Sequence, residues 1–167
     1  MTEIAEPVSS AEDTASAQNV AERAAAHIVA SDTAFRHFGM ELITVAPGAA
    51  TLAMTIADDM TNGHDTAHGG MIFTLADTAF AFACNAYGLK TVAAQCSITF
   101  VRPGRRGDRL VARAREISRA GRNGIYDVTV SVGDTVIAEF RGHSRTIGGS
   151  FVEDASKNGA PVGAPQS

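Results

Sequence analysis

Hydrophobic positions along the chain form one long continuous run and several shorter alternating runs. Residues 70–87 are apolar at nearly every position, which predicts a buried helix. A first helix is predicted upstream, over residues 19–31. The alternating runs predict β-strands at residues 40–45, 50–56, 92–100, 108–117, 125–132 and 135–147.

Short turn signals separate neighbouring strands and indicate how they connect. Pro-Gly pairs stand at 47–48 and 103–104, and glycine-containing segments stand at 121–124 and 133–134. Breaks this short predict antiparallel hairpins rather than a series of parallel strands with crossover helices. The expected fold class is therefore α+β, as a single domain with an antiparallel sheet.

The long helix sets the expected shape of that sheet. A helix on the surface of a sheet needs only one apolar stripe, whereas residues 70–87 are apolar nearly all round. Such a helix must be enclosed. The sequence therefore predicts a hotdog arrangement, in which the antiparallel sheet wraps around a long central helix.

The strand predicted at residues 92–100 supplies one apolar face to this arrangement. Its apolar side chains recur at every second position, and alternate residues of a strand point to the same side. The face is expected to consist of Val92, Ala94, Cys96, Ile98 and Phe100.

The two ends of the chain differ in composition from the middle. Residues 1–17 and 148–167 are rich in small and polar residues and show no periodicity, so both are expected to be disordered. Residues 18–147 then form the hotdog domain, which is long enough to bury a core of its own.

Charge and hydropathy exclude two classes of partner. A net charge of -4 and a pI near 5.7 do not suit nucleic-acid binding, which needs a basic surface. The best membrane-spanning candidate, residues 71–87, is short and contains Asp77 and Asn85, so no membrane partner is expected.

The expected compartment is the cytoplasm. The N-terminal residues are acidic where a signal peptide would be basic, and no apolar core follows them. Cys84 and Cys96 both lie in apolar surroundings, which is typical of reduced core cysteines.

Polar residues of the long helix are confined to one side. At about 100° per residue, a single narrow sector contains Thr74, Asp77, Thr78, Ala81 and Asn85. This seam either faces solvent or a subunit interface, with Asp77 in a structural role, or it is the wall of a site. Asp77 lies too far along the helix for the N-terminal dipole to explain it.

The start of the helix offers a second feature. Gly69 and Gly70 precede the apolar run, and backbone N–H groups in the first turn of a helix have no intrahelical partner. Such groups suit a developing oxyanion, although glycines at this junction also serve simply to permit a tight turn.

A single carboxylate beside an oxyanion site fits the chemistry of a thioester. Amide hydrolysis also needs an acid for the leaving amine, and the seam supplies none. A thiolate leaves readily without one, since a thiol such as cysteine has a pKa of about 8.5. Asp77, as nucleophile or as base for water, would then be sufficient.

Three segments of the chain resemble a known family. "NGHDTAHGGMIFTLADTAFAFACN", "ITFVRPGRRGDRLVARA" and "GRNGIYDVTV" are similar to hotdog-fold acyl-CoA thioesterases, above all to the phenylacetate-degradation (PaaI-type) branch. The resemblance covers roughly residues 20–147. It implies an acyl-CoA thioesterase acting on phenylacetyl-CoA, hydroxyphenylacetyl-CoA or a related aryl or medium-chain acyl-CoA, with no cofactor beyond the coenzyme A of the substrate.

The same resemblance implies roles for individual residues. Asp77 would be the catalytic carboxylate, Gly69 would offer its backbone N–H to the thioester carbonyl, Asn62 would position substrate or water, and His68 would support the loop. The family's sites lie between subunits, so a homodimer or tetramer is expected, with Asp77 and Asn62 from different chains. Substrate contacts are further expected at Gly70, Thr78, Arg102, Arg105, Arg106, Arg122, Asn123 and Gly124. The arginines among them either bind the phosphates of coenzyme A or are ordinary solvated residues of a turn and a strand edge.

Two observations limit these expectations. Some relatives carry a serine on the strand after the helix to hold the attacking water, and this chain has Ala93 at the corresponding place. His64 and His68 have a metal-like spacing, but they lie in a loop without a recognisable third ligand, so no metal site is expected.

Other members of the superfamily provide the alternative functions. A non-catalytic acyl-CoA-binding or regulatory protein would leave Asp77 with a structural role. A dehydratase would need a histidine paired with an acid on the central helix, and the nearest histidine, His68, precedes that helix.

Overall fold

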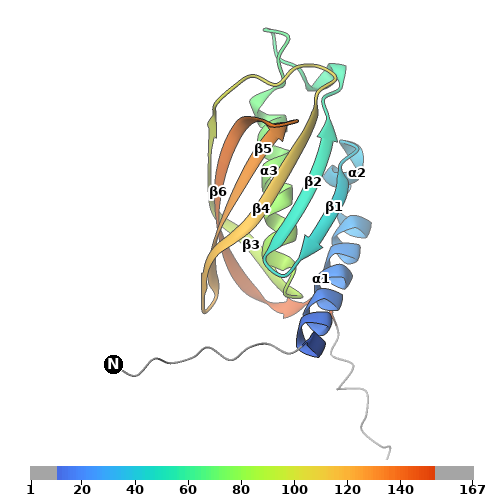
Figure 1. Cartoon of the computed structure of the whole chain (residues 1–167), viewed down its shortest axis with the longest axis vertical. Helices are drawn as coiled ribbons and strands as arrows, with labels where there is room; N and C mark the ends of the chain where they lie inside the picture. Colours follow the sequence, from blue (N-terminus) through green and yellow to red (C-terminus); the bar gives the residue numbers. More distant parts are fainter. Residues whose placement is uncertain (1–10, 153–167) are drawn as a thin grey trace, which may run out of the picture.

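The helix α3 (Gly69–Asn85) lies at the centre of the structure, and an antiparallel sheet curves around it (Figure 1). The computed structural model describes residues 11–152. Within them, the sheet has six strands in the order β1-β2-β4-β5-β6-β3. The strands are β1 (Glu41–Ala46), β2 (Ala49–Thr55), β3 (Leu89–Phe100), β4 (Arg109–Ala120), β5 (Asn123–Val132) and β6 (Thr135–Ser150). The remaining elements are α1 (Ala11–Ser31), α2 (Thr33–His37) and the short 3-10 helix η1 (Asp58–Met60).

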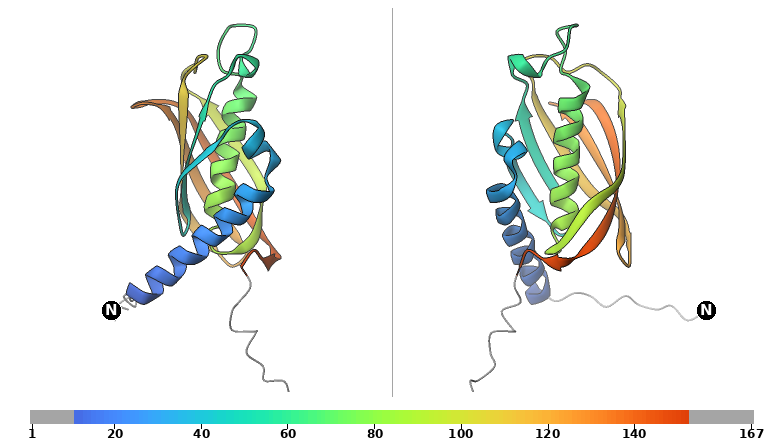
Figure 2. Two further views of the ribbon diagram at one scale, coloured as in Figure 1. Left: turned by 90° about the vertical axis from the view of Figure 1, so that its right-hand side faces the viewer. Right: turned by 180° about the vertical axis from the view of Figure 1, so that it is seen from behind.

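The concave face of the sheet and α3 together make the core. Fully buried side chains of α3, such as Leu75 and Phe80, meet buried residues of the sheet such as Leu52 and Val128. Seen from behind, α3 lies across the concave face, with α1 along one side of it (Figure 2). The predicted sheet wrapped around a long helix is therefore confirmed.

Local signals account for the two ends of α3. His68 caps the N-terminus, because its Nδ1 accepts a hydrogen bond from the Gly70 N–H at 2.9 Å. At the C-terminus, Gly88 adopts a φ of 78°, and its N–H donates to the Asn85 carbonyl at 2.9 Å. A residue without a Cβ takes this left-handed conformation without strain.

One predicted hairpin is wrong. β3 does not pair with β4 but lies at the edge of the sheet, antiparallel to β6. The Pro-Gly segment at 103–104 belongs to a connection that crosses from one side of the sheet to the other (Figure 1). The whole connection, residues 101–108, passes the ends of β5 and β6, and the Ala67 N–H donates to the Gly104 carbonyl at 2.9 Å on the way.

The predicted face of residues 92–100 is wrong in its first half. The register with β6 shifts between Ala93 and Gln95, so Ala94 is the extra residue of a β-bulge. The bulge reverses the alternation, and Val92 points outward, 44% exposed, while Cys96 and Ile98 point toward α3. A period-two pattern cannot reveal such an insertion.

The expected boundaries of the folded unit also move. α1 begins at Ala11, within the segment expected to be disordered, and Glu12 and Asp13 in its first turn suit the positive end of the helix dipole. β6 continues to Ser150, past the expected limit at residue 147. The predictions for residues 1–10 and 153–167 lie outside the described residues. Between these limits, no helix has the length and apolar character required to cross a membrane.

Close packing of β6 against α3 depends on Gly142. A Cβ at this position would lie 2.9 Å from three carbons of the buried Phe80 ring. We expect Gly142→Ala to lower the free energy of unfolding by about 1–3 kcal/mol through overpacking, as measured by urea denaturation. Gly63→Ala is the control, since a Cβ there has open space and a normal φ. Equal stability of the two variants would contradict the packing described here.

Candidate active site

The polar seam of α3 is its least buried side. Thr74, Asp77 and Ala81 are half-buried, whereas their neighbours on the sheet side, such as Leu75 and Ala76, are fully buried. The seam predicted from the helical wheel is therefore confirmed as a less buried stripe at these three positions, whereas its other two members, Thr78 and Asn85, are buried. It leaves Asp77 in partial contact with solvent in the single chain.

Most polar groups of the seam are satisfied by the backbone. The hydroxyl groups of Thr74 and Thr78 donate to the Gly70 and Thr74 carbonyls at 2.8 Å and 2.7 Å. Asn85 joins α3 to β3, accepting from the Thr91 N–H at 2.8 Å and donating to the Thr91 carbonyl at 3.0 Å. Its place on the seam is thus structural.

Asp77 differs from these residues in its partner and its ionisation. The Cys96 thiol donates to Asp77 Oδ1, with 3.6 Å between sulfur and oxygen. Burial raises the pKa of Asp77 above its ordinary value, and the hydrogen bond from Cys96 opposes part of that rise. From sequence, Cys96 was expected to be only a core cysteine, because nothing in the strand pattern indicates which helix residue it faces.

At the start of α3, the two glycines have different surroundings. The Gly70 N–H is occupied by the His68 cap, so it does not serve as a free donor. The Gly69 N–H has no acceptor within residues 11–152. A Cβ at Gly69 would lie 3.0 Å from the ring of Phe100, so this close approach also favours glycine.

Asn62 organises the loop that leads to α3. Its Oδ1 accepts from the His64 N–H at 2.9 Å, from the Thr66 hydroxyl at 3.1 Å and from the Thr66 N–H at 3.4 Å. Its Nδ2 group has no acceptor within the described part of the chain. The side chain therefore holds the loop through its oxygen and leaves an amide donor available.

A shallow groove of about 350 Å³ brings Asn62 and Gly69 together. Its lining includes Asn62 and Gly69 from the loop and helix start, and Phe100 and Arg102 from the end of β3 and beyond. Asp77 does not line it. Gly69 and Asp77 are eight positions apart, which corresponds to about 12 Å along a helix. One chain therefore does not bring its own Gly69 N–H and Asp77 carboxylate to the same small group.

Three of the predicted arginines lie near this groove, with different partners. Arg102 lines it and donates to the Val136 carbonyl at 3.1 Å. The exposed Arg105 is held by its backbone, whose N–H donates to Asp108. Arg106 is engaged by Asp65 at 2.7 Å and Asp58 at 3.3 Å, and Asp65 itself adopts a positive φ of 57°.

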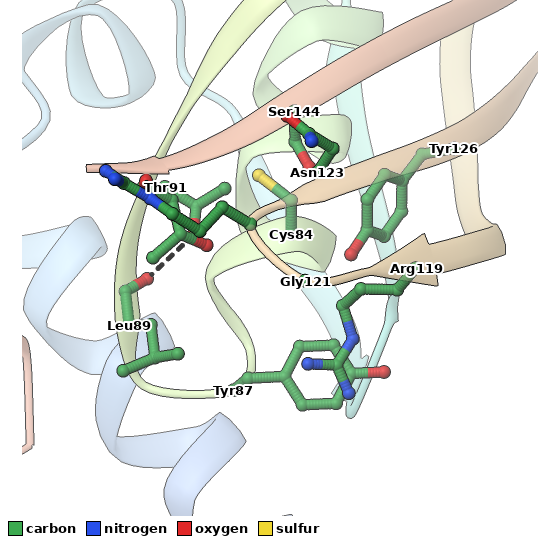
Figure 3. Close-up of a pocket in the computed structure, with 11 residues that line it drawn as sticks. Cys84, Tyr87, Leu89, Thr91, Arg119, Gly121, Asn123, Tyr126 and Ser144 are labelled. Atoms are coloured by element: carbon green, nitrogen blue, oxygen red, sulfur yellow. Dashed lines mark hydrogen bonds between the residues drawn. The ribbon is translucent and has the colours of Figure 1, made fainter. Parts of the chain in front are cut away.

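Arg122, Asn123 and Gly124 lie near the other end of α3. Arg122 and Asn123 line a pocket with Cys84 at the C-terminal end of the helix (Figure 3). Cys84 is about 22 Å from Gly69 along the helix, so the structure does not bring these residues together with the other arginines of the same chain. The pocket holds only about 10 Å³, room for one water molecule.

A polar network lies beside the pocket of Figure 3. Tyr87 and Tyr126 both donate to Oε2 of Glu116, at 2.9 Å and 2.8 Å. The guanidinium group of Arg119 lies over the Tyr87 ring, 3.8 Å from its centre (Figure 3). Gly124 fits beside this network because a Cβ would meet the Tyr126 ring at 2.7 Å.

The two loop histidines have no metal-like arrangement around them. Within residues 11–152, no three side chains of the metal-binding types are grouped closely enough to hold an ion. His64 is exposed, and His68 uses Nδ1 for the helix cap.

Comparison with known proteins gives consistent matches. A model of the Thioesterase superfamily matches residues 64–139. The acyl-coenzyme A thioesterase PaaI of Escherichia coli is 42% identical over 126 residues, which cover 75% of this chain and 90% of that protein. The solved structure of the E. coli PaaI protein from the phenylacetic acid degradation operon has a TM-score of 0.78 at 40% identity, covering 80% of this chain and 97% of that one.

A further solved structure contains a ligand. A Streptococcus mutans protein bound to acetyl-CoA has a TM-score of 0.63 at 25% identity, covering 65% of this chain and 89% of that one. These structural matches confirm the fold predicted from the sequence.

The burial of Asp77 has a consequence for stability. Because its pKa is higher in the folded than in the unfolded chain, the folded state binds the proton more tightly. The free energy of unfolding therefore falls as pH rises from 3.8 through the raised folded value, and the penalty is complete above it. We expect Asp77→Asn to be more stable than the natural chain at neutral pH.

Urea denaturation as a function of pH tests this expectation. The advantage of Asp77→Asn should shrink as pH falls through the window and disappear below it. Asp134→Asn is the control, because that side chain is exposed in the β5–β6 turn and has no burial cost. An advantage that does not change with pH would contradict the assigned cause.

Proposed function

Because the chain belongs to the thioesterase superfamily, we propose that it hydrolyses acyl-CoA thioesters to the free acid and coenzyme A. Family membership confirms the resemblance seen in the sequence. The relative from E. coli is named an acyl-CoA thioesterase, and the S. mutans neighbour binds acetyl-CoA. The observation in this chain that carries the proposal is the half-buried carboxylate of Asp77 on the open seam of α3.

The proposed site is shared between two copies of the chain. Gly69 and Asp77 lie about 12 Å apart along one helix, so a second chain must bring its Gly69 and Asn62 to the first chain's Asp77. The free edge of the sheet supports such pairing. Among residues 11–152, β3 has one neighbouring strand, β6, and its apolar residues Leu89, Val92 and Phe100 are 44%, 44% and 50% exposed.

In the proposed reaction, the Gly69 N–H polarises the thioester carbonyl. It is the unoccupied donor at the positive end of α3, where negative charge on the carbonyl oxygen is stabilised. His68 fixes this turn by capping Gly70, and Asn62 offers its free Nδ2 group to substrate or water. These residues together place the carbonyl carbon for attack.

Asp77 supplies the attack in one of two ways. As a nucleophile, its oxygen bonds to the carbonyl carbon while the C–S bond breaks, and water then hydrolyses the mixed anhydride. As a general base, it takes a proton from water, whose oxygen attacks the carbon while the CoA thiolate leaves. Both routes need the carboxylate in its ionised form, and neither needs an acid for the thiolate.

The proposed substrate class is aryl acyl-CoA, with phenylacetyl-CoA and its hydroxylated forms first. The support is the E. coli PaaI protein, which comes from a phenylacetic acid degradation operon. The proposed contacts to the phosphates of coenzyme A are Arg102, which lines the groove, and the exposed Arg105, whose backbone pairs with Thr66 of the groove lining. We place the reaction in the cytoplasm, where thiols such as Cys84 and Cys96 stay reduced.

Release of free CoA thiol from a panel of acyl-CoAs tests the proposal. The panel contains phenylacetyl-, hydroxyphenylacetyl-, benzoyl-, short-chain and long-chain acyl-CoA. We expect kcat/KM above about 10⁴ M⁻¹s⁻¹ for the aryl-acetyl members. Asp77→Asn should lower turnover about 10³-fold or more, because the amide is neither base nor nucleophile, and should retain binding of the CoA ester.

Asp134→Asn again serves as the control, since its exposed turn lies outside the site. Unchanged turnover in Asp77→Asn would remove Asp77 from the mechanism. Absence of thiol release from every ester, with tight binding by calorimetry, would instead support the acyl-CoA-binding alternative.

A further inference from the structure

The Asp77 carboxylate has a single hydrogen-bond donor within residues 11–152, the thiol of Cys96. The two hydroxyl groups nearest to it on the helix do not compete, because Thr74 and Thr78 each donate to a backbone carbonyl one turn earlier. The thiol reaches Oδ1, and no donor within the same residues reaches Oδ2. One carboxylate oxygen is therefore held and the other is open.

The backbone of β3 fixes the thiol in this position. After the bulge at Ala94, Cys96 pairs with Gly142 and Ile98 pairs with Phe140, so both side chains face α3. Gly142 has no side chain, and the ring of Phe80 fills the space above it. Cys96 thus stands on the concave side of β3, opposite Asp77 in the middle of the helix.

We propose that Cys96 is a positioning residue for Asp77, whose thiol holds Oδ1 so that Oδ2 is directed to the substrate. This inference rests on the proposed thioesterase function. A thiol is a weak donor, so it orients the carboxylate while withdrawing little of the negative charge that the reaction uses. A serine hydroxyl in the same place would bind the carboxylate more strongly and make it a weaker base.

The ionisation of Cys96 is consistent with this role. Burial, followed by the neighbouring Asp77, raises the pKa of the Cys96 thiol to about 11. The thiol is protonated at neutral pH, so it acts as a donor and not as a nucleophile. In return, the hydrogen bond from Cys96 lowers the pKa of Asp77 against the larger effect of burial.

Two variants of Cys96 with side chains of similar size distinguish the effect of a hydrogen-bond donor from the effect of packing. Cys96→Ala and Cys96→Ser leave almost the same space, and they differ in whether a donor remains. The Asp77 carboxyl is titrated by ¹³C NMR in the intact protein, with its signal assigned by its absence from Asp77→Asn. We expect the pKa of Asp77 to be higher in Cys96→Ala than in Cys96→Ser.

Cys84→Ala is the matched control. This buried thiol also lies on α3 near the seam, but it donates to the Ala81 carbonyl and not to Asp77. The titration of Asp77 should be the same in Cys84→Ala as in the natural chain. Identical titrations in Cys96→Ala and Cys96→Ser would overturn the proposal, whether or not the protein hydrolyses any acyl-CoA.

Kinetics supply the second readout. With the best ester of the panel, we expect kcat in Cys96→Ala to fall about three- to tenfold at unchanged KM, and Cys96→Ser to recover most of that loss. The acid limb of the pH–rate profile should lie at higher pH in Cys96→Ala than in Cys96→Ser. Equal loss in both variants would assign Cys96 to packing alone. Because the NMR titration needs no turnover, failure of this inference is distinguishable from failure of the proposed function.

Discussion

The enclosure of α3 by a curled sheet is the constraint on which the rest of the structure depends. A helix that is apolar on nearly every side is stable in water only when other elements cover it, and one antiparallel sheet does so by curving around it. The curved sheet has long strands, β3 at one edge and a connection that crosses from β3 to β4. It also leaves one stripe of the helix less buried than the others.

The carboxylate of the proposed site lies on that stripe. Asp77 stands on it, and burial raises the pKa of its carboxyl group. In the part of the chain that the structure describes, its one hydrogen-bond donor is the weak donor Cys96. The free N–H of Gly69 and the free amide of Asn62 lie at the start of the helix, beyond the reach of the same chain's carboxylate. The geometry of a rigid helix therefore favours a site assembled from two copies, and the exposed apolar edge of β3 is the surface that such a pair needs.

Hydropathy patterns predicted α3, the six strands, the second half of α1 and the position of Asp77 on a polar side of the helix, because residues that point toward the core recur with the period of the element. The short helices α2 and η1 were not predicted. The patterns failed where a feature interrupts the period or arises across the sheet. The bulge at Ala94 turns Val92 outward. The first turns of α1, from Ala11, have no apolar stripe from which a helix could be predicted. The contact of Cys96 with Asp77 depends on the register between a strand and a helix, which no local pattern records.

Complementation between two inactive chains tests the shared site most directly. Asn62→Asp retains the oxygen that holds the loop and removes the amide donor, while Asp77→Asn removes the carboxylate. Differently tagged copies of the two variants are co-expressed, and the mixed oligomer is isolated and assayed for thiol release. If each site combines Asn62 of one chain with Asp77 of the other, a mixed pair has one site with both natural residues and one site with both substitutions. About half of the natural activity should then return. Activity no higher than that of either variant alone would contradict a site shared between chains.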